Sequence, residues 1–200
     1  MIKLAIFDMD GVLANTTHIH TSALRDAVYT RVHEEASREH YLTASDGIRT
    51  TNKLECLRAQ YGLSDEIVKS IDELKESLTL NAFGSIQKNE LLISEFSRIK
   101  NKGIRIAIGS NSRRVYVDKI IQSLGLSEFI DFSIAGNEVF RSKPDPEIFN
   151  TIMARFNISN EDTIIFEDSI AGLKAAHEAK ANVEFVNNRT LITLEQLRKI

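Results

Sequence analysis

Close to its N-terminus, at residues 4–13, the chain reads Leu-Ala-Ile-Phe-Asp-Met-Asp-Gly-Val-Leu. The apolar run 4–7 predicts a short buried strand, and two carboxylates follow it. Asp8 and Asp10 are two residues apart, so in an extended chain both side chains leave the same face. Negative charges that converge at the end of an apolar strand need a cation, and Gly11 allows the chain to turn away. The stretch predicts a cation site, although taken alone it also fits a polar strand end before an ordinary turn.

The composition excludes several classes of protein. Two hundred residues, 42% of them hydrophobic, can bury the core of one domain or of one domain with a smaller insertion. The formal net charge of -3 provides no basic surface, so we expect no nucleic-acid partner. The apolar stretches are only as long as strands and no charged leader precedes them, so we expect no membrane partner, no signal peptide and a cytoplasmic location. The single cysteine, Cys56, excludes an internal disulfide, and we expect it to be buried in a helix.

Four further apolar runs, at residues 104–108, 132–135, 163–166 and 183–186, predict strands. The runs are continuously apolar instead of alternating, which is typical of strands that are covered on both faces. Segments with helical periodicity lie between the later runs. Together they predict an α/β protein with a doubly wound, Rossmann-like parallel sheet.

Three helices of this sheet have recognisable starts. Ser112 is a candidate N-cap for the helix that follows it. Asp145 is a candidate N-cap with Pro146 at the first helical position, which suits proline because the N–H that it lacks would have no partner there. A third helix is expected from near Ser169 to about Ala179.

The interval between the first two strands is too long for a single crossover. It contains about 95 residues, whereas a strand-helix-strand unit needs about 30. Residues 86–100 carry the apolar stripe of the crossover helix, so the excess is an insertion. We expect an α/β core at residues 1–13 and 82–200 and a small helical cap at residues 14–81, with helices near 21–38, 51–60 and 65–77.

Ligands of a doubly wound sheet bind beyond the carboxyl ends of its strands, so the residues there indicate the chemistry. Asp8 and the pair Glu167 and Asp168 lie at two such ends and would form an anionic pocket. Oxygen ligands of this kind suit Mg²⁺. Taken separately, Glu167 and Asp168 also fit acids at a helix start, where the helix dipole favours them.

Two more strand-end loops carry groups that suit phosphoryl oxygens. Ser110 and the backbone N–H of Asn111 lie where a helix is expected to begin, and helix N-termini bind anions. Lys143 adds positive charge where a transferred phosphoryl group gathers negative charge. Singly, Ser110 fits a turn residue and Lys143 a solvated surface residue. Their joint occurrence at successive strand ends favours transfer of a phosphoryl group to a carboxylate.

Four segments of the chain match, in order, the motifs of a known family; they are residues 8–13, 108–111, 142–149 and 166–176. These motifs resemble those of the haloacid dehalogenase superfamily, in its subfamily with a helical cap, which includes β-phosphoglucomutase and phosphoglycolate phosphatase. The resemblance covers nearly the whole chain, and the ordered set is much more specific than the first motif alone.

The resemblance implies a phosphatase that hydrolyses a small phosphorylated metabolite, a phosphomonoester, with Mg²⁺ as cofactor. Asp8 would be the nucleophile that forms an aspartyl-phosphate, and Asp10 would be the general acid and base. Ser110, Asn111 and Lys143 would hold the phosphoryl group. The metal ligands would be Asp8, Asp10 through its backbone carbonyl, Glu167 directly or through water, and Asp168. We expect a monomer or a weak homodimer.

Three side chains of the expected cap are candidates for contacts beyond the phosphoryl group. His20 lies at the cap entrance and is a candidate to orient Asp10. Arg49, in the segment 47–54, is a candidate to bind a second anionic group of the substrate. Lys75 is a weaker candidate of the same kind.

Three alternative functions share parts of this pattern. A phosphomutase has all the same core residues and differs in excluding water from the phosphoenzyme. A phosphonatase-type lyase needs a cap lysine that forms a Schiff base, and Lys53 is available, but its neighbours do not supply the desolvated setting. A signalling receiver domain also has clustered acids and a lysine, but it has no inserted cap and is phosphorylated at the end of a later strand.

Overall fold

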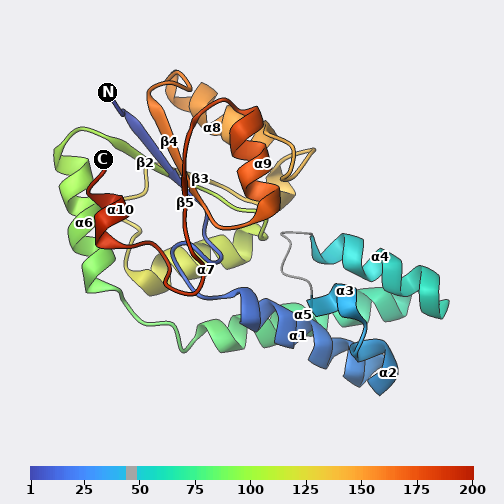
Figure 1. Ribbon diagram of the computed structural model, residues 1–200. Coiled ribbons are helices and arrows are strands. Elements are labelled where there is room, and N and C mark those ends of the chain that lie inside the picture. The colour runs from blue at the N-terminus through green and yellow to red at the C-terminus, as the bar shows by residue number, and fades with distance from the viewer. Residues whose placement is uncertain (44–48) are drawn as a thin grey trace. The chain divides into compact units, whose positions relative to one another are not determined.

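The computed structural model describes residues 1–43 and 49–200. Five parallel strands form one sheet in the order β3-β2-β1-β4-β5 (Figure 1). Their bounds are Leu4–Phe7 for β1, Arg105–Gly109 for β2, Phe132–Ile134 for β3, Thr163–Glu167 for β4 and Asn182–Phe185 for β5. The predicted α/β class with a doubly wound parallel sheet is confirmed, and each strand overlaps its predicted run.

The helices of the sheet lie on both of its faces. The crossovers are α6 (Glu90–Asn101), α7 (Arg114–Leu124), α8 (Glu147–Phe156) and α9 (Ile170–Glu178). The chain moves outward from β1 to β3 and then returns to β4 and β5 on the other side of β1. Because such crossovers are right-handed, α6 and α7 cover one face and α8 and α9 the other, as Figure 1 shows. The 3-10 helix η1 (Gly136–Glu138) follows β3, and α10 (Leu194–Leu197) follows β5.

The first strand is the best packed element of the sheet. Leu4 and Ile6 belong to the apolar cluster formed with α8 and α9. Phe7 points to the opposite face, where its ring centroid lies 4.9 Å from that of Phe96 and 4.8 Å from that of Phe166. All five side chains are fully buried. Each such burial contributes about 1.5–3 kcal/mol, so the strand that leads into Asp8 is held firmly from both faces.

The last strand differs from the prediction that every strand is covered on both faces. Val183 and Phe185 are 38% and 57% exposed. β5 is the edge of the sheet and pairs only with β4, so fewer elements lie over it. The side chain of Gln196, in α10, donates a hydrogen bond to the Phe185 carbonyl at 2.7 Å.

Two of the three predicted helix starts are shifted. The N-cap of α7 is Arg113 and not Ser112, because the Ser112 hydroxyl donates a hydrogen bond to Asp10 instead. The helix α8 begins one residue later than predicted, so Pro146 is its N-cap residue instead of its first helical residue. The Asp145 carboxylate accepts a hydrogen bond from the Glu147 N–H at 3.0 Å. The start of α9 is confirmed, because Ser169 is its N-cap and accepts from the Gly172 N–H at 3.0 Å.

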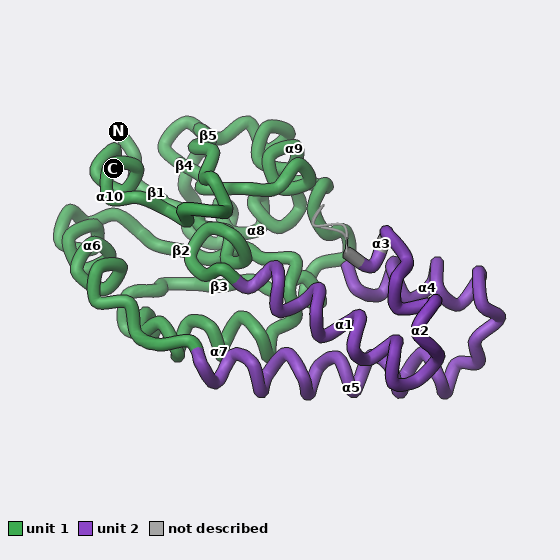
Figure 2. The backbone as a smooth tube through the Cα atoms, turned by 60° about the horizontal axis from the view of Figure 1, so that its bottom comes forward, with its two compact units in different colours: residues 1–15, 86–200 green, residues 16–85 purple. Residues whose placement is uncertain are grey.

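The chain divides into two compact units, residues 1–15 with 86–200 and residues 16–85 (Figure 2). The second unit contains α1 (Thr17–Arg31), α2 (Glu34–Ser37), α3 (His40–Thr43), α4 (Thr50–Tyr61) and α5 (Asp65–Phe83), and its described residues contain no strand. The helix predicted at 21–38 is interrupted, because His33 is extended and caps α2 by accepting from the Ala36 N–H at 3.2 Å. Across the described ranges, no helix is both long and apolar enough to span a membrane.

The prediction that Cys56 is buried is wrong. It lies in α4, as expected for a helical residue, but it is exposed. The helix buries Lys53, Leu54 and Leu57. At 100° per residue, Cys56 points roughly 100° away from the centre of that buried stripe. Helical periodicity therefore placed the residue in the right element and on the wrong side of it.

Asp131, just before β3, connects three parts of the core. Its carboxylate accepts hydrogen bonds from the Ile106 N–H at 2.8 Å, from Lys100 at 2.6 Å and from Arg105 at 2.8 Å. Burial by itself would raise the pKa of Asp131, but these three hydrogen bonds outweigh it and hold the pKa below its ordinary value. The ionised carboxylate therefore stabilises the folded state.

We expect Asp131→Asn to lower the free energy of unfolding at pH 7 by on the order of 1 kcal/mol, because Lys100 and Arg105 are partly exposed to solvent. The folded pKa is depressed, so the stabilisation is complete above the unfolded pKa and is lost as the pH falls through the folded pKa. Urea unfolding at pH 7 and at about pH 3 measures this, and the difference between the two proteins should be smaller at the lower pH. Asp162→Asn, at a solvent-exposed ion pair with Lys3, is the control and should change less. An equal loss at both pH values would contradict the assignment.

Candidate active site

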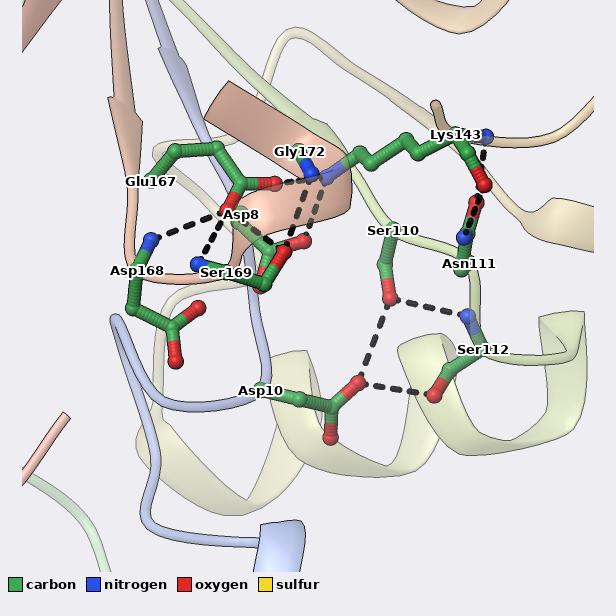
Figure 3. Close-up of polar contacts among 10 residues, drawn as sticks. All are labelled: Asp8, Asp10, Ser110, Asn111, Ser112, Lys143, Glu167, Asp168, Ser169 and Gly172. Carbon is green, nitrogen blue, oxygen red and sulfur yellow. Dashed lines mark hydrogen bonds and ion pairs between the residues drawn. The ribbon is translucent and has the colours of Figure 1, made fainter. Parts of the chain in front are cut away.

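The candidate site lies within the first unit, at the carboxyl ends of β1, β2 and β4 (Figure 3). Phe7 of β1 is paired with Phe166 of β4, and the Asp8 N–H donates to the Phe166 carbonyl at 2.9 Å. Glu167 is the last residue of β4. Strand pairing therefore brings the acids of the first and last motifs side by side.

A buried lysine lies between these acids. The Lys143 ammonium is 2.6 Å from Oδ1 of Asp8 and 2.5 Å from Oε1 of Glu167. The Lys143 side chain is only 2% exposed, and its ammonium lies 4.8 Å from the ring centroid of Phe149. The interpretation of Lys143 as a solvated surface residue is thus excluded, and the structure brings Lys143, Asp8 and Glu167 together as the sequence predicts.

Three carboxylates lie close together at this site, and Lys143 is the cation that contacts two of them. Asp8, Glu167 and Asp168 each offer a carboxylate oxygen, and these oxygens lie within 4.8 Å of one another. One oxygen of Asp168, Oδ1, is buried and has no hydrogen-bond partner among the described residues. Buried carboxylate oxygens need a proton, a donor or a metal ion. The donor set therefore fits a divalent cation that takes hard oxygen ligands, such as Mg²⁺.

The same crowding shifts the pKa values of the cluster. Burial raises the pKa of Asp8 well above its ordinary value; Lys143 opposes this, while Glu167 and Asp168 add to it. Burial and the neighbouring Glu167 raise the pKa of Asp168 to about 6, against the opposing effect of the Asn188 side chain. Burial would lower the pKa of Lys143, but attraction to Asp8 and Glu167 outweighs it and raises that pKa. Lys143 is therefore a permanent cation, and additional positive charge would favour the anionic carboxylates.

Glu167 is fixed by the turn that follows it. Its Oε2 accepts from the Asp168 N–H at 2.9 Å, from the Ser169 N–H at 3.0 Å and from the Ser169 hydroxyl at 3.1 Å. Gly172 leaves room for this carboxylate, because a Cβ on Gly172 would lie 1.7 Å from Oε1 of Glu167. Ser169 and Gly172 thus determine where the Glu167 carboxylate, a candidate metal ligand, lies.

Asp10 has different surroundings from Asp8. Its Oδ2 accepts from the Ser112 hydroxyl at 2.7 Å and from the Ser110 hydroxyl at 3.3 Å. The Ser110 oxygen in turn accepts from the Ser112 N–H at 3.0 Å. The Asp10 carboxylate therefore accepts hydrogen bonds from two hydroxyls, whereas the Asp8 carboxylate contacts the Lys143 ammonium. Its predicted contact with the metal through the backbone carbonyl stays a prediction.

The sequence does not indicate Ser112 and Asn188 as members of the site. Its pattern predicts Ser112 as a helix cap, whereas in the structure the Ser112 hydroxyl donates to Asp10. Asn188 follows β5 in a polar segment without a motif, so no signal pointed to it. The segment that follows Asn188 is hydrogen-bonded to the first motif, because the Ile192 N–H donates to the Val12 carbonyl at 3.0 Å.

The three cap residues that are candidates for substrate contacts all lie in the second unit. His20 of α1 and Lys75 of α5 lie side by side, with 3.2 Å between Nδ1 of His20 and Nζ of Lys75. Lys75 and Lys53 are both buried, and Arg49 is the N-cap residue of α4. Residues 47 and 48, which belong to the segment predicted to meet the substrate, lie outside the described residues. The roles of His20, Arg49 and Lys75 toward a substrate stay predictions.

We expect Gly172→Ala to destabilise the protein, although alanine inside a helix normally stabilises by about 1 kcal/mol relative to glycine. The reason is the collision of the new methyl group with Glu167. Urea unfolding of a double-mutant cycle tests this cause. In a Glu167→Ala background the collision is absent, so Gly172→Ala should become neutral or stabilising. The same destabilisation in both backgrounds would show that Glu167 is not responsible.

Several known proteins are similar to this chain over most of its length. The profile of one family, described as haloacid dehalogenase-like hydrolase, matches residues 5–186. A phosphorylated carbohydrates phosphatase of Thermotoga maritima is 26% identical over 181 residues, which cover 89% of this chain and 82% of that protein. The β-phosphoglucomutase of Bacillus subtilis is 24% identical over 191 residues, covering 89% and 80%. A crystal structure of β-phosphoglucomutase from Clostridium difficile covers 100% of this chain and 96% of its own with a TM-score of 0.77 and 22% identity, which shows a shared fold.

Proposed function

Because the chain belongs to the haloacid dehalogenase-like hydrolase family, we propose that it is a Mg²⁺-dependent phosphatase that hydrolyses a small phosphomonoester through an aspartyl-phosphate on Asp8. The observation that carries the proposal is the buried cluster of Asp8, Lys143, Glu167 and Asp168 at the ends of adjacent strands. A charged cluster of this kind is costly in a stable core and is typical of a site that handles charge during a reaction.

The residues that would hold Mg²⁺ are Asp8 and Asp168, together with Glu167 directly or through a water and the backbone carbonyl of Asp10. Oδ1 of Asp168 supports this choice, since it is buried and has no hydrogen-bond partner among the described residues. When bound, Mg²⁺ would neutralise the negative charge of the carboxylates and of the phosphate, so that an anionic Asp8 can approach phosphorus.

In the proposed reaction the two aspartates have separate tasks. An oxygen of Asp8 attacks phosphorus, the bond from phosphorus to the ester oxygen breaks, and the leaving alkoxide takes a proton from the Asp10 carboxyl. The deprotonated Asp10 then removes a proton from water, whose oxygen attacks phosphorus and releases inorganic phosphate and free Asp8. Lys143 orients Asp8 through Oδ1 and stabilises charge on the phosphoryl oxygens, which Ser110 and the backbone N–H of Asn111 also bind.

We propose a phosphorylated carbohydrate as the substrate. The supporting observation is the relative from Thermotoga maritima, whose name states that class. Arg49 would bind a second anionic or strongly polar group of such a substrate. A phosphomutase is the second candidate, favoured by the relative from Bacillus subtilis, because it would use the same core residues. The cytoplasmic location and a monomeric or weakly dimeric state stay predictions.

We expect the purified protein with Mg²⁺ to release inorganic phosphate from at least one member of a panel of sugar phosphates, phosphoglycolate and nucleoside monophosphates. Asp8→Asn should lower kcat by at least about a thousandfold, because an amide is not a nucleophile toward phosphorus. Free phosphate and isomerised product are measured in the same reactions. Isomerised product without net phosphate release would favour the phosphomutase, and full activity of Asp8→Asn would contradict both mechanisms.

We expect EDTA to abolish the activity and added Mg²⁺ to restore it. Asp168→Asn should raise the Mg²⁺ concentration for half-maximal activity by at least about tenfold, because it removes a charged oxygen ligand. Asp162→Asn, at the opposite end of β4, is the matched control and should leave this concentration unchanged. Activity that persists in EDTA would exclude the metal from the mechanism.

A further inference from the structure

We propose that Asn111 is a positioning residue whose side chain fixes Lys143 by holding the lysine's backbone. The inference rests on the proposed function, since it assigns Asn111 a role in that reaction beyond the backbone contact to phosphate already expected. The carboxamide of Asn111 engages both main-chain groups of Lys143 (Figure 3).

The contact is reciprocal. The Lys143 N–H donates to Oδ1 of Asn111 at 3.0 Å, and Nδ2 of Asn111 donates to the Lys143 carbonyl at 3.1 Å. One side chain thereby satisfies both polar groups of a residue that belongs to a loop between η1 and α8. The loop is outside the sheet, so these two bonds substitute for the pairing that a strand would supply.

The position of the Lys143 backbone decides where its ammonium lies. Lysine has four rotatable side-chain bonds, so a displaced Cα moves the charge away from its partners unless the side chain finds another conformer. The ammonium has partners on two separate strands, at 2.6 Å from Asp8 and 2.5 Å from Glu167. Distances of this size are sensitive to shifts well below 1 Å, and misplacement on that scale lowers catalytic rates strongly.

Asn111 is itself attached to a rigid part of the sheet. The Ser110 N–H donates to the Ile134 carbonyl at 3.1 Å, and the Gly136 N–H donates to the Ser112 carbonyl at 2.8 Å. A Cβ on Gly136 would lie 2.2 Å from the Asn111 carbonyl oxygen, so the chain here is closely packed. Through the Asn111 carboxamide, the position of the Lys143 backbone therefore depends on the positions of β2 and β3.

The test compares Asn111→Ala with the substitution of another asparagine of the same unit whose side chain also bonds to the main chain. Alanine removes the carboxamide and keeps the backbone N–H that is expected to bind phosphate, so the two roles are separated. Asn182→Ala is the control, since Nδ2 of Asn182 donates to the carbonyls of Glu161 and Thr163 at 2.9 Å each, at the amino end of β4. With Mg²⁺ and the best substrate of the panel, kcat/KM should fall on the order of 10–100-fold for Asn111→Ala and stay within about threefold for Asn182→Ala.

A double-mutant cycle shows whether Asn111 acts through Lys143. Affinity for inorganic phosphate in the presence of Mg²⁺ is measured by calorimetry for the wild type, Asn111→Ala, Lys143→Met and the double variant. Asn111→Ala should weaken phosphate binding in the wild type and have no further effect when Lys143 is methionine. Equal weakening in both backgrounds, or an unchanged kcat/KM, overturns the inference.

Three further outcomes have a fixed interpretation. If Asn111→Ala does not fold, as judged by circular dichroism, Asn111→Ser replaces it in both measurements, because its hydroxyl keeps at most one of the two hydrogen bonds. If the wild type binds phosphate but hydrolyses no phosphomonoester, the proposed function fails while the binding cycle still decides the role of Asn111. A wild type that neither binds phosphate nor hydrolyses any phosphomonoester overturns both the proposed function and the role of Asn111.

Discussion

The buried contact of Lys143 with Asp8 and Glu167 is the interaction on which the rest of the site depends. Two carboxylates from adjacent strands end within reach of one another because β1 and β4 are paired in register. Without a cation between them, both would be buried charges, and removing one partner from such a group costs about 3–5 kcal/mol. The lysine loop therefore supplies the positive charge that opposes the cost of burying these two carboxylates.

Asp8 and Asp10 illustrate how neighbours give the same side chain two chemical characters. Asp8 lies beside a lysine, and burial and the neighbouring Glu167, Asp168 and Asp10 all raise its pKa. Asp10 accepts hydrogen bonds from the hydroxyls of Ser110 and Ser112. An acid that exchanges a proton with substrate and water benefits from neutral, rotatable donors, because a fixed positive charge would hold it ionised. An acid that attacks phosphorus benefits from the opposite arrangement. The division of roles that we propose for Asp8 and Asp10 is consistent with these different neighbours.

Most of the core could be predicted from the sequence because its signals are local. The apolar runs mark strands, and the rule that ligands bind at the carboxyl ends of parallel strands selects Asp8, Lys143, Glu167 and Asp168. The errors have long-range causes. Ser112 looks like a cap until Asp10, which is 102 residues earlier in the chain, competes for its hydroxyl. Asn188 faces Asp168 from a loop without any motif. Periodicity placed Cys56 in a helix but could not tell which side of that helix is covered.

The central place of the first strand also determines when the site can come into existence. β1 is synthesised first, yet one of its two neighbours, β4, begins only at Thr163. A growing chain therefore carries the leading aspartate long before the acids of β4 or the lysine loop have left the ribosome, and one edge of β1 stays unpaired meanwhile. Pairings between such distant segments are slow to form. The nascent chain consequently lacks the assembled cluster of Asp8, Lys143 and Glu167. Until β4 pairs with it, one edge of the apolar first strand is open to association with other chains.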